Sequence, residues 1–87
     1  CWEQAEPARK LAHLQDIPVL VVEAEASYHA PYDHCTARYL RQAGVMKTTY
    51  VRLADLGIHG NGHMLMIEKN NGEIVDVAMK WLTEIGL

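Results

Sequence analysis

Two histidines in a glycine-rich stretch are the residues of this sequence best suited to chemistry. Positions 53–64 read Leu-Ala-Asp-Leu-Gly-Ile-His-Gly-Asn-Gly-His-Met, which places His59 and His63 on either side of two glycines and an asparagine. Imidazole accepts and releases protons near neutral pH, and glycine permits backbone angles that hold a ring in one place. The stretch therefore indicates a general acid–base site or, more simply, a tight turn with two surface histidines.

A metal site is the second chemistry that two neighbouring histidines suggest. His59 and His63 are four residues apart, a spacing that brings both rings to one face only on a helix. Gly60 and Gly62 oppose a helix here, and no third ligand is evident. We therefore expect neither a metal nor another cofactor.

Two strands and an intervening helix would position this loop. Residues 17–22 form a continuous apolar run, which is typical of a strand covered on both faces in a parallel sheet. A helix is predicted over about 31–42, and a second strand over 48–53. Because ligands bind at the carboxyl ends of parallel strands, the loop that follows the second strand is expected at the ligand-binding edge.

A final amphipathic helix is predicted from Asn70 or Asn71, either of which could cap it, to about Ile85. The apolar positions that repeat at helical spacing are Ile74, Val75, Ala78, Trp81, Leu82 and Ile85. The predicted fold class is therefore α/β, with the element order β-α-β-α. A short amphipathic helical turn is also expected within residues 7–14.

The chain is too small to cover such a sheet by itself. Its 87 residues form one domain at most, and strands this apolar need helices on both faces and neighbouring strands. We therefore expect residues 1–87 to be one edge of a larger, mostly parallel sheet in a three-layer sandwich. Because the chain begins with Cys1 rather than methionine, the rest of the sheet is expected in an upstream segment of the same precursor, separated by proteolytic processing and retained as a heterodimer.

Composition argues against two classes of partner. The net charge of −3 provides no basic surface for nucleic acid, and no apolar run reaches the ~20 residues of a membrane span. Neither cytoplasmic nor secreted localisation is favoured by these features.

The glycine-rich loop resembles that of a known enzyme family. The pattern is a strand, a helix, a second strand, a loop ending in Gly-His-Met and a final amphipathic helix. This pattern looks like the C-terminal end of an α/β-hydrolase. Residues 56–64, together with Glu68-Lys69-Asn70-Asn71, are similar in detail to a bacterial and fungal branch of serine esterases. The resemblance covers essentially all 87 residues, and the His-Gly-Asn-Gly-His-Met run is its most specific part.

The resemblance implies that His63 is the general base of a catalytic triad and that His59 shapes the loop or the pocket. It also implies that the serine nucleophile lies upstream, because no Gly-x-Ser-x-Gly motif is present. The expected reaction is hydrolysis of a carboxylic ester or lactone through an acyl-enzyme, with a small ester-like molecule as substrate.

The acid of the triad stays open at this point. In many α/β-hydrolases an aspartate follows the strand that corresponds to residues 17–22, but Ser27 occupies roughly that place. Glu25 and Asp33 are the nearby substitutes, and the most similar branch implies a glutamate upstream of Cys1 instead.

Cys1 and Cys35 could form a disulfide, because both are expected near one edge of the sheet. A buried Cys35 and a loose chain end at Cys1 are the alternative.

Two other functions fit the same pattern. A non-hydrolytic relative of the α/β-hydrolases could bind a small molecule, or guide its cyclisation or isomerisation. A stand-alone α/β module with an interaction role is the other.

Overall fold

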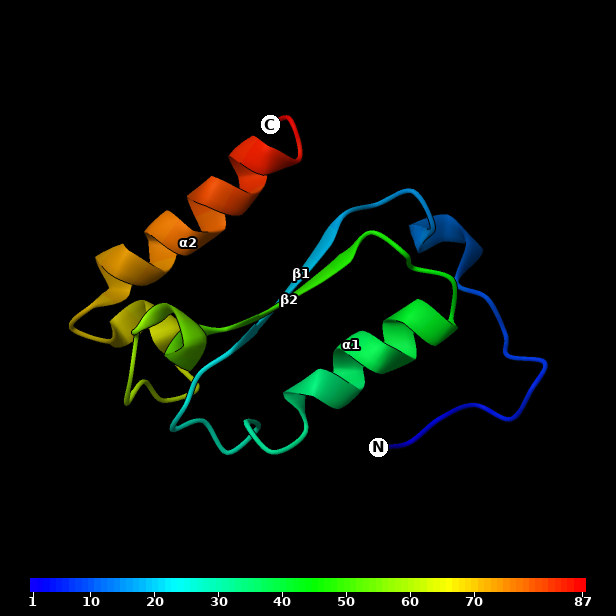
Figure 1. Ribbon diagram of the computed structural model, residues 1–87, viewed down its shortest axis with the longest axis horizontal. Coiled ribbons are helices and arrows are strands. Elements are labelled where there is room, and N and C mark those ends of the chain that lie inside the picture. Colours follow the sequence, from blue (N-terminus) through cyan, green and yellow to red (C-terminus); the bar gives the residue numbers. More distant parts are fainter.

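The computed structural model describes residues 1–87 and shows a small α/β fold (Figure 1). Its strands and helices are β1 (Val19–Glu23), α1 (Asp33–Gln42), β2 (Thr48–Arg52) and α2 (Asn71–Glu84), with single 3-10 turns at Ala12–Leu14, Leu53–Leu56 and Leu65–Ile67. The predicted order β-α-β-α is therefore present. The helical turn expected within residues 7–14 is limited to the first of these 3-10 turns.

The two strands form a parallel sheet, with α1 as the connection between them. Their register pairs Val19 with Thr48 at one end and Glu23 with Arg52 at the other. The first strand starts later than predicted because Pro18 has no N–H to donate, so the ladder begins where the N–H of Val19 donates to the carbonyl of Lys47.

The helices lie on either side of the sheet (Figure 1). α1 contacts both strands, whereas α2 approaches the other face through Ile74 and Val77. These two residues pack against a small core of Ala24, Leu53 and Ile58. No helix has the length and apolar character that crossing a membrane requires.

Two predictions about α2 need correction. Val75 is 55% exposed, and Val77 reaches the core in its place, because Val77 lies three residues after Ile74 on the same stripe. Asn70 does occupy the position before the helix, but its side chain does not cap it. That amide bonds to Asn61 instead, and the amide of Asn71 bonds to the carbonyl of Met66.

The fold exposes more surface than a compact protein of this mass. Its accessible area is 6097 Å², whereas a folded monomer of 9.8 kDa exposes about 5,200 Å². The radius of gyration of 14.1 Å likewise exceeds the roughly 12 Å of a compact domain of this length. Only Leu53 and Val45 are large side chains that are fully buried. The excess of roughly 900 Å² is close to what one partner contributes to a stable interface.

Candidate functional site

His63 lies on the loop after β2, where its two ring nitrogens have different surroundings. Nδ1 is 3.1 Å from the hydroxyl oxygen of Ser27, which lies on the loop after β1. The ring is exposed, and Nε2 has no hydrogen-bond partner within the chain, whereas Ser27 is only 7% exposed. Nδ1 is therefore hydrogen-bonded within the chain, and Nε2 is accessible for proton transfer.

Two aromatic rings from the loop after β1 lie next to His63. The ring of His29 stacks on it with centroids 4.6 Å apart, and the ring of Tyr28 lies 5.0 Å away. Asp33 is 3.7 Å from Nδ1 of His29, and burial raises the pKa of this carboxyl group above its usual value. Asp33 thus lies beside His29, and no hydrogen bond joins its carboxylate to His63.

Glu25 pairs with His59 and not with His63. Its carboxylate is 3.0 Å from Nδ1 of His59 and accepts the N–H of Gly60 at 3.2 Å. These bonds, with that of His59 the stronger influence, hold the pKa of Glu25 below its usual value. The two predicted histidines therefore have separate partners, Glu25 for His59 and Ser27 for His63. This separation is unlike a shared metal site.

The loop between these histidines is fixed by buried and backbone hydrogen bonds. Asn61 is 3% exposed, and its amide forms a reciprocal pair with that of Asn70, in which Asn70 Nδ2 donates to Asn61 Oδ1 at 3.1 Å. The carbonyl of Asn61 also accepts the N–H of Ala26 at 2.9 Å, which ties the two loops together. The N–H of Gly62 donates to Glu68 at 2.9 Å, and a Cβ at Gly62 would lie 3.2 Å from the same carboxylate oxygen. The hydrogen bonds that fix the backbone next to His63 thus come from residues that carry the sequence resemblance, namely Asn61, Gly62, Glu68 and Asn70.

We expect Asn61→Ala to lower the free energy of unfolding by about 2–3 kcal/mol, because two hydrogen bonds are lost and the half-buried Asn70 amide loses its partner. Chemical denaturation of the full-length protein measures this change. Asn71→Ala is the matched control, since it removes one exposed bond to a carbonyl and should cost less than about 1 kcal/mol. Equal losses for the two variants would contradict a special role for the Asn61–Asn70 pair.

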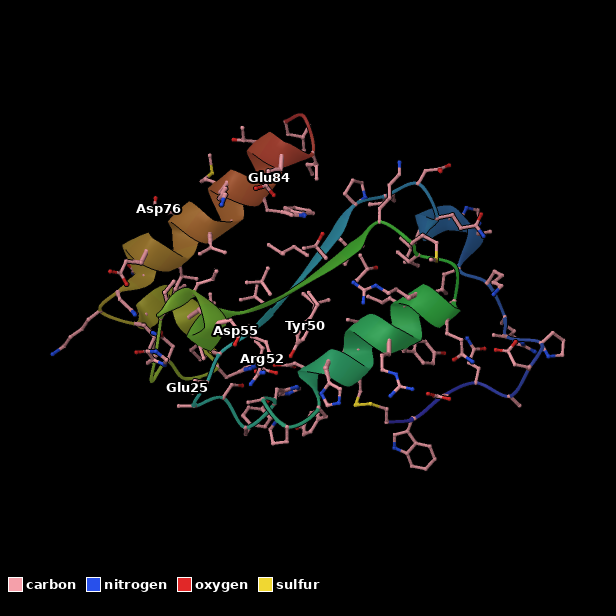
Figure 2. The ribbon with its side chains drawn as sticks, in the orientation of Figure 1. Glu25, Tyr50, Arg52, Asp55, Asp76 and Glu84 are labelled. Atoms are coloured by element: carbon pink, nitrogen blue, oxygen red, sulfur yellow. A yellow bond between two sulfur atoms is a disulfide. The ribbon has the colours of Figure 1, made fainter.

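A buried carboxylate at the end of β1 escaped the sequence analysis. Glu23 is 6% exposed, accepts a hydrogen bond from the hydroxyl of Tyr50, and lies 2.9 Å from Nε of Arg52. Figure 2 shows Tyr50 and Arg52 extending from β2 on the side where α1 lies. Burial alone would raise the pKa of Glu23, but the hydrogen bonds from Tyr50 and Arg52 outweigh it and hold the pKa below 4.5. Burial and the same bond raise the pKa of Tyr50. An acidic residue that ends one strand opposite an arginine that ends the next could have signalled this pair.

The lowered pKa of Glu23 predicts an acid-sensitive contribution to stability. A carboxyl group with a lowered folded-state pKa stabilises the fold above its unfolded value near 4.5, and this stabilisation is lost as pH falls through the folded value. In Glu23→Gln, stability should therefore decline less steeply below pH ~4.5 than in the wild type. Urea unfolding between pH ~3 and ~7 measures both slopes, and parallel curves would contradict the assignment.

Cys1 and Cys35 form a disulfide that joins the N-terminal segment to α1, with Cα atoms 5.1 Å apart. Nε2 of His34 lies 3.5 Å from one sulfur and 3.6 Å from the other. These three side chains have the right proximity for a metal, but cysteine binds metal as thiolate, and both sulfurs are in the disulfide.

Comparison with known proteins finds a protein similar in sequence to nearly the whole chain. Over 82 residues, which are 94% of the chain, the sequence is 55% identical to a "Probable secreted lipase phiG" from Fungal sp. (strain ATCC 74256). The chain spans 22% of the length of that relative. No family model matches the sequence, and no solved structure matches it. The chain is therefore similar, over nearly its whole length, to part of a protein named as a lipase.

Proposed function

We propose that this chain is the C-terminal segment of an α/β-hydrolase and supplies the general base of a serine ester hydrolase. The observation that carries the proposal is the arrangement of His63, whose Nδ1 is bonded to a buried group while Nε2 is accessible at the carboxyl edge of a parallel sheet. Similarity to a protein named as a probable lipase supports ester hydrolysis as the reaction.

In the proposed reaction His63 moves one proton twice. A serine hydroxyl from the upstream segment attacks the ester carbonyl carbon while Nε2 of His63 takes the hydroxyl proton. The carbonyl re-forms as the bond to the leaving alcohol breaks, and the imidazolium gives its proton to that alcohol. Water then attacks the acyl-enzyme by the same route, which releases the carboxylic acid and restores the serine. Backbone N–H groups for the oxyanion would come from upstream.

The proposed acid also belongs to the upstream segment. Glu25 has its two oxygens engaged with His59 and Gly60, and Asp33 lies beside His29. Neither carboxylate forms a hydrogen bond with His63, so an upstream glutamate is favoured over both.

The uncovered surface supports the same assignment. β1 has one strand neighbour, and the roughly 900 Å² of excess area is enough for an interface with a substantial partner. We assign that partner to the segment upstream of Cys1, in the same polypeptide or held to it after cleavage.

Labelling of the full-length protein with a serine-directed fluorophosphonate tests the proposal. The serine oxygen displaces fluoride from phosphorus, so a stable adduct on one serine is expected, together with hydrolysis of p-nitrophenyl butyrate. The expected adduct lies outside residues 1–87. A folded protein that forms no adduct would instead favour a non-hydrolytic binding protein or isomerase.

A further inference from the structure

Ser27 has a hydrogen-bonding position that the proposed reaction does not itself explain. It is the one serine in the chain, and its hydroxyl oxygen lies 3.1 Å from both Nδ1 of His63 and the backbone nitrogen of His29. Its N–H donates to the carbonyl of Ala24, and its carbonyl accepts the N–H of Ala30. The hydroxyl is therefore fixed by its own backbone, and its 7% exposure leaves little room for water.

The direction of the hydrogen bond between this hydroxyl and Nδ1 decides which tautomer His63 adopts. A hydroxyl has one hydrogen to donate and two lone pairs that accept, and the N–H of His29 uses one lone pair. If the hydroxyl donates to Nδ1, the ring hydrogen of neutral His63 is on Nε2, which then cannot accept a proton. If the second lone pair accepts a hydrogen from Nδ1, Nε2 is free to act as the base.

We infer that Ser27 is a positioning residue, which accepts the Nδ1 hydrogen of His63 and so holds the imidazole with Nε2 unprotonated and accessible. This inference rests on the proposed role of His63 as general base. With both lone pairs of Ser27 occupied, its own hydroxyl hydrogen is left for an acceptor from outside this chain. The carboxylate of the upstream acid has the chemistry to be that acceptor, and it would discourage the competing arrangement in which Ser27 donates to Nδ1.

Other groups near His63 do not offer the same restraint. His29 contacts it by stacking, Tyr28 approaches through its ring, and the carboxylate of Asp33 pairs with His29. The bond between Ser27 and Nδ1 is the one hydrogen bond that His63 makes through its side chain within the chain.

Two substitutions at this position should change the pH dependence of the reaction in opposite directions. Ser27→Ala removes an acceptor that favours the protonated ring, so the acidic limb of kcat/KM should move to lower pH. Ser27→Asp places a carboxylate beside Nδ1, so the same limb should move to higher pH. Ser27→Ala should also lower kcat about tenfold, the loss expected for one hydrogen bond, with KM nearly unchanged.

The measurements use the full-length protein, p-nitrophenyl butyrate as substrate, and Thr83→Ala as the control. Thr83 donates its hydroxyl hydrogen to a carbonyl within α2, so its removal should leave the pH profile unchanged. Nitrogen NMR of histidine-labelled wild-type protein supplies a test that needs no variant. The neutral ring of His63 should carry its hydrogen on Nδ1.

Several outcomes would overturn the role of Ser27 and leave the hydrolase intact. These are an unshifted limb in both variants, shifts in the same direction, or a neutral ring with its hydrogen on Nε2 in a wild-type protein that labels with fluorophosphonate. Failure of the wild-type protein to label or turn over ester would instead count against the proposed hydrolase.

Discussion

Replacement of His63 by alanine in the full-length protein should lower kcat for p-nitrophenyl butyrate by roughly 10⁴–10⁶-fold, the usual effect of removing a triad base. In the proposed reaction, loss of the imidazole leaves no group that accepts the serine proton or returns it to the leaving alcohol. The fold should be little affected, because the side chain is exposed and makes a single hydrogen bond within the chain. Steady-state kinetics and thermal unfolding of the same preparation measure both effects.

His59→Ala is the matched control for this experiment. The two histidines share one loop, but the ring of His59 is 61% exposed and bonded to Glu25, away from Ser27. Its removal should lower kcat by less than about tenfold, through a looser loop. Comparable losses in the two variants would show that their roles are misassigned.

The elements of the fold could be predicted from the sequence because each leaves a local pattern. The apolar run at 17–22 and the β-branched run at 48–53 mark both strands, and the periodic apolar residues mark α2. The bounds were less accurate where one residue changes the backbone. Pro18 delays the first strand, and Leu53 leaves the second to enter a 3-10 turn as its side chain becomes buried.

The partners within the site could not be predicted, because they depend on how two distant loops meet. Sequence reasoning singled out His63 and noted the position of Ser27, but the bond between them joins residues 36 apart. The sequence offers Glu25 as a possible acid for His63, yet its carboxylate bonds to His59 across 34 residues. Asn70 was expected to cap a helix, which is a local role, and its amide forms the pair with Asn61 instead. Amide and carboxylate side chains have several possible partners, and only tertiary structure decides among them.

The isolated 87-residue chain should fail to unfold cooperatively, even with its disulfide intact. Its accessible area of 6097 Å² means that about 57% of the unfolded surface is buried, which is less than the roughly 60% of smaller marginal domains. The free edge of β1 and the exposed side chains of Met46, Ile67 and Met79 add a tendency to associate. Differential scanning calorimetry should show a broad or absent transition, and light scattering should show aggregates.

Co-expression with the proposed upstream segment is the control for this experiment. If the proposed upstream segment supplies the next strand and covers the apolar surface, the two pieces should purify together and unfold in one transition. A soluble monomer of 9.8 kDa with a sharp transition would contradict this expectation. The stand-alone module would then be the better description, since its strands would need no further neighbours.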